Sequence, residues 1–129
     1  MVVGVDSASA ARIESSRARL WLWRSCRAED FAVTGVDISS VQIERARNFV
    51  PRAEFVCADM TEVDFPAESF AAIVSLYAII HIPLDEQPAL FAKLFEWLQP
   101  EGYLLVTVGN RAWTGVEENW LDVTGATMF

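Results

Sequence analysis

The chain has 129 residues, 53% of them hydrophobic and 22% charged, which suffices for one domain with a buried core. The formal net charge of -8 and the lack of a basic stripe argue against nucleic acid or an anionic membrane surface as a partner and favour a small-molecule ligand. Cys26 and Cys57 form no Cys-x-x-Cys pair, and no apolar segment is long enough to span a membrane, so we expect reduced thiols, no metal and a cytoplasmic protein.

Residues 1–30 follow no clear pattern. The first six resemble a short strand that ends in an acid, but residues 17–29 carry four arginines around Trp21 and Trp23 and contain few strand formers. We therefore separate residues 1–30, an atypical N-terminal segment, from residues 31–129, which we expect to form a partial domain.

A strand-helix-strand unit follows. Residues 31–37 and 54–59 are short apolar runs of the kind found in buried strands. Between them Ser39 and Gln42 have capping-box spacing, and a helical pattern follows at Val41, Ile43, Ala46, Phe49 and Val50. A unit of this length is right-handed, so its two strands should be parallel.

Each of these two strands ends in an acidic residue, Asp37 or Asp59. In parallel strands both carboxylates lie at one edge of the sheet, where ligands of such folds bind. A carboxylate there can accept hydrogen bonds from ribose hydroxyls or from an adenine amine. The alternative for each aspartate is a local role, capping the turn or helix that follows.

Strands and helices continue to alternate. We expect a strand over residues 71–77, a helix that begins near Asp85, a stop at residues 100–102 and a strand over residues 103–108. The apolar residues of this helix lie three and four apart, at Leu90, Phe91, Leu94, Phe95 and Leu98. The alternation predicts an α/β fold, with a parallel sheet and helices on its faces.

Three segments, residues 33–37, 57–60 and 98–104, resemble in order and spacing the motifs of class I S-adenosylmethionine-dependent methyltransferases of the small-molecule type. The resemblance covers about residues 31–128 and implies a Rossmann-like three-layer sandwich with a mainly parallel sheet. The family's sheet has seven strands and a glycine-rich cofactor loop after the first. With four clear strands and no such loop, this fold is expected to be incomplete at both ends.

The missing loop suggests a hypothesis for residues 1–30. Tryptophan has the single codon TGG, so Trp21, Leu22 and Trp23 are encoded by TGG-CTN-TGG if Leu22 uses a CTN codon. Read one base later, the same bases begin and end with a glycine codon. The segment would then be an out-of-frame or otherwise scrambled first β-α unit.

The resemblance implies S-adenosylmethionine as the cofactor, with Asp37 on the ribose hydroxyls and Asp59 on the adenine amine. It also implies that Ile38 packs on the adenine and that Met60 flanks the ring. For Ile38 and Met60 the alternative is ordinary core packing.

The segment after the next strand completes the expected site. The backbone of Ser75, Leu76 and Tyr77 would lie beside the methionine part of the cofactor. His81, the single histidine, is the candidate general base, because histidine titrates near neutral pH, and Tyr77 is a second candidate at the reaction centre. The alternatives are that His81 caps or packs a loop and that Tyr77 belongs to the core.

The function expected from the sequence is methyl transfer from S-adenosylmethionine to an unidentified small-molecule acceptor. The alternative is an inactive methyltransferase-like fragment that keeps a partial adenosine site. A nicotinamide-dependent dehydrogenase ranks third, since residues 100–102 and the lack of a Tyr-x-x-x-Lys pair argue against it. An incomplete sheet leaves an unpaired edge, through which the chain could form a homodimer.

Overall fold

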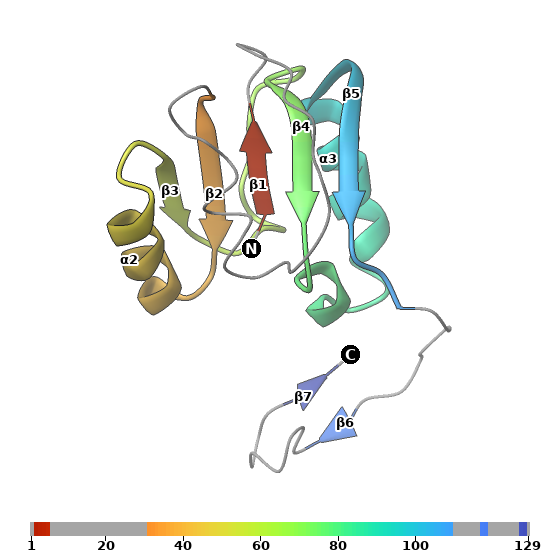
Figure 1. Cartoon of the computed structure of the whole chain (residues 1–129). Coiled ribbons are helices and arrows are strands. Elements are labelled where there is room, and N and C mark those ends of the chain that lie inside the picture. The colour runs from red at the N-terminus through yellow and green to blue at the C-terminus, as the bar shows by residue number, and fades with distance from the viewer. Residues whose placement is uncertain (1, 6–30, 110–116, 119–126, 129) are drawn as a thin grey trace.

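The fold is built on a five-stranded sheet with the order β3-β2-β1-β4-β5 (Figure 1). The computed structural model describes residues 2–5, 31–109, 117–118 and 127–128. The strands of this sheet are β1 Val2–Val5, β2 Val33–Asp37, β3 Glu54–Cys57, β4 Phe70–Ser75 and β5 Leu98–Val106. The described helices are α2 Ser40–Phe49, the short 3-10 helix η1 Ile79–His81 and α3 Gln87–Trp97. A separate antiparallel pair joins β6 Glu117–Glu118 to β7 Thr127–Met128.

The two halves of the sheet are built alike. β2 pairs with β3 in parallel, and β4 pairs with β5 in parallel. The first pair is connected through α2 and the second through η1 and α3, which lies behind β4 and β5 in Figure 1. The α/β class expected from the sequence is therefore confirmed.

The central strand β1 runs against its neighbours. Its residue Val2 pairs with Val36 of β2 and with Ser75 of β4, both in antiparallel register, and its arrow opposes the other four in Figure 1. Two of the four strand pairs are thus parallel and two antiparallel, yet β2, β3, β4 and β5 all run the same way, as in the mainly parallel sheet expected from the sequence. A four-residue strand can satisfy its backbone groups in either direction, so its sequence does not set its orientation.

The larger apolar core lies between α3 and the sheet. The side chains of Leu90, Leu94 and Trp97 form the buried face of α3. Phe65 packs edge-on against both Phe70 and Trp97, with ring centroids 5.1 Å apart in each pair. The helical face expected from the sequence was partly wrong: Phe95 is 65% exposed, and Leu98 begins β5, because the helix ends at Trp97.

A smaller core lies under α2. Ile43, Ala46 and Val50 pack there with Phe55 of β3. The predicted cap is present, because the Ser39 hydroxyl accepts a hydrogen bond from the Gln42 backbone N–H at 3.4 Å. Two residues of the expected apolar pattern instead face solvent, Val41 and Phe49.

The sequence suggested that residues 100–102 end the helix. In the structure the helix ends earlier, at Trp97, and these residues form a turn inside β5. Phe70 pairs with Leu98, but Ala72 pairs with Tyr103, so the chain bulges between these two register positions. Glu101 has a φ of 64°, in the left-handed region. A Cβ on Gly102 would lie 2.8 Å from the backbone oxygen of Gln99, so glycine is required there.

Among the described residues, no helix has the length and apolar character needed to cross a lipid bilayer.

Candidate functional site

The candidate site is the edge of the sheet where β2, β3, β4 and β5 end. Asp37, the last residue of β2, pairs in parallel register with Cys57 of β3. The backbone N–H of Ala58 then donates to the carbonyl oxygen of Asp37 at 3.1 Å. Asp59 follows one residue later, so both acidic residues lie at this edge, in the arrangement that the sequence predicts.

Each aspartate holds the turn that follows it. Oδ1 of Asp37 accepts from the backbone N–H of Ser39 at 2.8 Å. Oδ1 of Asp59 accepts from the backbone N–H of Thr61 at 2.9 Å and from the Thr61 hydroxyl at 2.8 Å. The local role considered for both residues is therefore present. A carboxylate has about four lone-pair sites. These hydrogen bonds to the turn therefore orient each carboxylate and leave it able to accept further hydrogen bonds.

The two apolar residues beside these aspartates differ in their surroundings. Ile38 is 73% exposed, so it is not a core residue, and its carbonyl oxygen lies 3.7 Å from the Cys57 sulfur. Met60 is half-buried and packs against the core under α3. The core-packing alternative therefore describes Met60 and not Ile38.

At the end of β4 the chain passes from a buried residue to a strained one. Ser75 is wholly buried, and its hydroxyl has no hydrogen-bond partner among the described residues. Its carbonyl oxygen accepts from the Thr107 N–H at 3.0 Å, and Leu76 is half-buried. Tyr77 is 47% exposed and has a φ of 54°, a left-handed conformation that is rare for a bulky residue and common at functional sites.

His81 is exposed and ends η1, which follows β4 at the same edge of the sheet (Figure 1). Its backbone N–H donates to the carbonyl oxygen of Ala78 at 3.0 Å, which closes the single turn of this helix. The structure thus brings the segments that carry His81 and Tyr77 to the edge that also carries Asp37 and Asp59.

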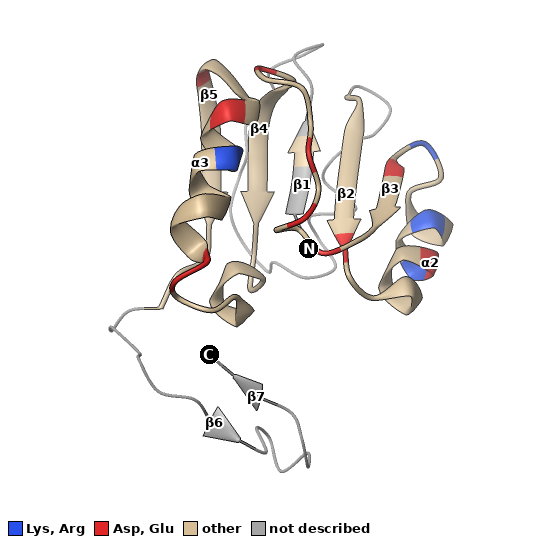
Figure 2. Cartoon of the chain, turned by 180° about the vertical axis from the view of Figure 1, so that it is seen from behind, with Lys and Arg blue, Asp and Glu red and all other residues tan. Residues whose placement is uncertain are grey.

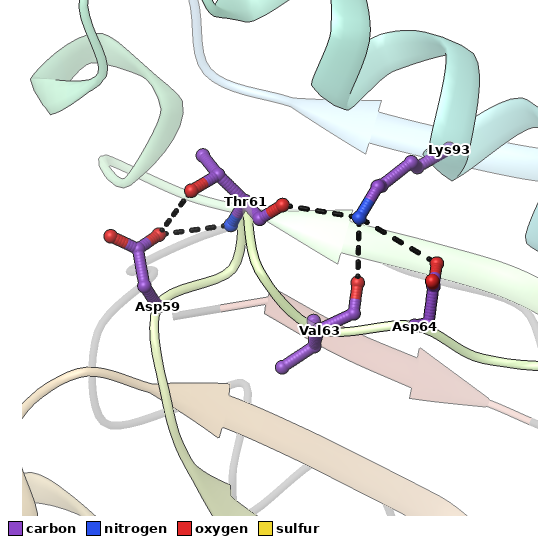
Figure 3. A network of polar contacts seen from close by, with 5 residues as sticks. All are labelled: Asp59, Thr61, Val63, Asp64 and Lys93. Atoms are coloured by element: carbon purple, nitrogen blue, oxygen red, sulfur yellow. Dashed lines mark hydrogen bonds and ion pairs between the residues drawn. The ribbon is translucent and has the colours of Figure 1, made fainter.

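Sequence reasoning missed two residues near Asp59. Thr61 supplies both donors to its carboxylate, and the Asp-x-Thr spacing, which is typical of a side-chain-stabilised turn, could have indicated this. Lys93 of α3 contacts the same segment through hydrogen bonds to the carbonyl oxygens of Thr61 and Val63 (Figure 3). Its sequence position gave no such signal, since it simply flanks the apolar face of the helix.

Basic residues form no continuous stripe on the described surface. Figure 2 shows blue residues on α2 and in the turn after it, with one more on α3. One of those on α2, Arg47, is engaged in the fold, because its guanidinium donates to the carbonyl oxygen of Phe55 at 3.0 Å.

A small hollow lies beside β1, between the sheet and α3. Its volume is about 10 Å³, and Gly4, Met60, Val63 and Phe70 are among the residues that line it. This is about the space of one water molecule, which is too small for a ligand of cofactor size. Among the described residues no three His, Cys, Asp or Glu side chains are grouped to hold a metal ion.

The chain is similar to known methyltransferases. A family model described as a methyltransferase domain matches residues 15–102. Phosphoethanolamine N-methyltransferase 3 of Arabidopsis thaliana is 37% identical over 82 residues, which are 60% of this chain and 16% of that protein. The phosphoethanolamine N-methyltransferase of Plasmodium falciparum is 35% identical over 92 residues, 68% of this chain and 33% of that protein. A sterol 24-C-methyltransferase of Debaryomyces hansenii is 31% identical over 60% of this chain and 22% of its own. The chain thus spans a third or less of each of these relatives.

Solved structures also match. The PH0226 protein of Pyrococcus horikoshii superposes with a TM-score of 0.50 at 26% identity, over 57% of this chain and 38% of that one. A TehB-like SAM-dependent methyltransferase of Corynebacterium glutamicum gives a TM-score of 0.54 at 18% identity, over 74% of this chain and 64% of that one. At 18% identity the second match supports the fold alone.

Proposed function

Since the chain belongs to the methyltransferase-domain family, and within it to the class I methyltransferases that use S-adenosylmethionine, we propose that the edge bearing Asp37 and Asp59 binds the adenosine part of this cofactor. The observation that carries the proposal is the pair of carboxylates at the ends of two adjacent parallel strands. Asp37 would accept hydrogen bonds from the ribose hydroxyls, and Asp59 from the adenine amine.

The exposed side chain of Ile38 supports the same assignment. An apolar side chain that is 73% exposed beside a carboxylate offers a face on which an adenine ring can pack. Met60 packs against the core, so its proposed contribution to adenine binding is smaller than that of Ile38. It would flank the ring and anchor the loop backbone beside it.

The methionine part of the cofactor fits the described residues less well. Because β1 is antiparallel, the chain leaves β1 at the edge opposite to Asp37. The family's glycine-rich loop follows the first strand at the same edge as the acids, whereas here Val5, the last residue of β1, lies at the opposite edge. The described contribution to this half is the backbone of Ser75, Leu76 and Tyr77.

When bound, S-adenosylmethionine supplies a methyl group on a positively charged sulfur, and we propose transfer to a small-molecule acceptor. The tasks of the chain are then to hold the acceptor in line and to remove water. His81 would take the proton from an acceptor that must lose one, and Tyr77 would border the acceptor. The named relatives act on phosphoethanolamine or on sterols, which makes these two compounds the first acceptors to assay.

A second candidate function is an inactive methyltransferase-like chain with a partial adenosine site. The direction of β1 favours it, because the described end of this strand, Val5, lies at the edge opposite to the acids. The two candidates differ in one measurable quantity, the affinity that the homocysteine part adds to adenosine.

Isothermal titration of the purified chain tests both candidates, with S-adenosylhomocysteine, adenosine and NAD as ligands. The proposed methyltransferase site predicts micromolar binding of S-adenosylhomocysteine, weaker binding of adenosine and none of NAD. Equal affinities for S-adenosylhomocysteine and adenosine would favour the inactive site. Absence of heat with both, from a folded sample, would overturn the proposal.

The nature of residues 1–30 is a separate proposal: a first β-α unit that is out of frame or scrambled. Support comes from the contrast between residues 31–109, which form the β-α units expected from the sequence, and a first strand that runs in the reverse direction. Sequencing the source DNA tests it. Codons that encode no glycine-rich loop in any frame would overturn it.

We also propose that the chain is cytoplasmic and forms a homodimer through a sheet edge. Cys57, which is exposed and free, suits a reducing compartment. β3 and β5 are the edges of the described sheet, and Tyr103 of β5 is 76% exposed. Size-exclusion chromatography with light scattering tests the dimer, since a monomer at all concentrations would contradict it.

A further inference from the structure

Lys93, the only lysine of the chain, connects α3 to the segment that follows β3. Its ammonium nitrogen lies 3.1 Å from the carbonyl oxygen of Thr61 and 3.1 Å from that of Val63. It also lies 3.6 Å from Oδ1 of Asp64 (Figure 3). One side chain thus contacts three residues that lie about 30 positions away in sequence.

The two carbonyl contacts matter more than the ion pair. The side chain of Asp64 is 82% exposed, so its attraction to the ammonium is screened by water and contributes little. The Lys93 side chain is 31% exposed, and hydrogen bonds from an ammonium to partly buried carbonyls are charge-assisted. The main effect of Lys93 is therefore to fix the backbone of residues 61–63.

Thr61 links this contact to the candidate site. Its carbonyl oxygen accepts from Lys93, while its N–H and its hydroxyl both donate to Oδ1 of Asp59. Figure 3 shows these contacts as a continuous path from the helix to the carboxylate. The side chains of Met60 and Val63 pack against the core under α3, so the segment is also fixed on its apolar side.

We infer that Lys93 is a positioning residue, which acts through Thr61 to orient the Asp59 carboxylate toward a bound adenine. This inference rests on the proposed function, because Asp59 is assigned to adenine only there. Lys93 itself would not touch the ligand.

A double-mutant cycle tests the inference through the affinity for S-adenosylhomocysteine. Lys93→Met keeps the length of the side chain and removes the ammonium, and we expect about a tenfold loss of affinity. Asp59→Asn keeps an oxygen for Thr61 but turns an amide donor toward the adenine amine, and we expect a loss of about tenfold or more. In the Lys93→Met background, Asp59→Asn should cost less than about threefold, since the misplaced carboxylate has little left to lose.

Two further variants serve as controls. Lys93→Arg retains charge and donors and should recover most of the affinity. Glu62→Gln changes an exposed side chain in the same segment and should leave the affinity unchanged. Equal costs of Asp59→Asn in both backgrounds would overturn the inference, because a purely structural role of Lys93 produces no coupling.

A measurement without ligand separates the inference from the proposed function. Hydrogen exchange at the Thr61 amide, which donates to Asp59, should become at least about tenfold faster in Lys93→Met, whereas exchange at Ile43 in α2 should not change. Unchanged exchange at Thr61 would overturn the inference. Faster exchange at Thr61, together with an Asp59→Asn variant that binds S-adenosylhomocysteine normally, would instead overturn the adenine assignment of Asp59. If Lys93→Met does not fold, Lys93→Gln, which removes the charge and keeps a neutral donor, should show a smaller coupling of the same sign with Asp59→Asn.

Discussion

The hydrogen bond from the Ala58 N–H to the carbonyl oxygen of Asp37, at 3.1 Å, extends the pairing of β2 and β3 one residue beyond their last register pair. It keeps the two strand ends together beyond the point where the sheet stops. The side chain of Asp37 and the turn at Asp59 are therefore held on one rigid edge.

Substitution of Asp37 separates its ligand role from its turn role. Asp37→Asn keeps an oxygen that can accept from the Ser39 N–H but loses the charge, so the affinity for S-adenosylhomocysteine should fall about 10- to 100-fold. Asp37→Ala should show the same loss and, in addition, a free energy of unfolding about 1 kcal/mol lower than that of Asp37→Asn. Isothermal titration and urea unfolding measure the two effects. Wild-type affinity in Asp37→Asn would remove Asp37 from the site.

Residues 101 and 102 should respond to substitution with opposite signs. Glu101→Gly relieves the φ of 64° and should raise the free energy of unfolding by about 1 kcal/mol, and Glu101→Ala, which keeps the strain, is its control. Gly102→Ala drives a Cβ against backbone oxygens of Gln99 and Ala71 and should lower the free energy of unfolding by about 1 to 3 kcal/mol. Urea unfolding tests both changes, and equal stabilities of Glu101→Gly and Glu101→Ala would contradict the first.

Ser75→Ala should stabilise the protein. The Ser75 hydroxyl is wholly buried and has no partner among the described residues, so its removal should raise the free energy of unfolding by about 1 kcal/mol. Thermal and urea unfolding of the two proteins give the answer. A loss of stability would mean that the hydroxyl forms a hydrogen bond outside the described part of the chain.

Gly4→Ala tests the position of β1. A Cβ at this residue would collide with the ring of Phe70, so the variant should lose about 1 to 3 kcal/mol of stability. Phe70→Leu replaces the ring by a smaller side chain and so removes part of the collision. The double variant should therefore be more stable than the sum of the two single effects predicts. If Gly4→Ala has no effect, Val2–Val5 does not occupy the centre of the sheet.

The elements that the sequence predicted well are those with local signals. The Ser39 cap, the apolar runs of β2, β3 and β4 and the three- and four-residue spacing along α3 depend on neighbours in sequence. Boundaries were less accurate. α3 begins at Gln87, two residues after Asp85, because Pro83 to Glu86 form a turn in which the carbonyl oxygen of Pro83 accepts from the N–H of Glu86 at 3.0 Å.

What the sequence did not predict depends on distant partners. The direction of β1 is decided by its two flanking strands and not by its own four residues. The contact of Lys93 with Thr61 joins positions 32 residues apart, and no spacing rule covers it. Likewise Met60, which had two interpretations of equal weight, is assigned to the core only by the packing of α3.

The reversed direction of β1 also has a practical consequence for handling the protein. Val2 pairs with Val36 and Ser75, near the ends of β2 and β4, so any affinity tag fused ahead of Val2 emerges beside Asp37. A tag there would lie at the edge proposed to bind adenosine and would compete with the ligands used in titrations. Cleaving such a tag before ligand screening therefore removes an obstruction built in by the topology of the sheet.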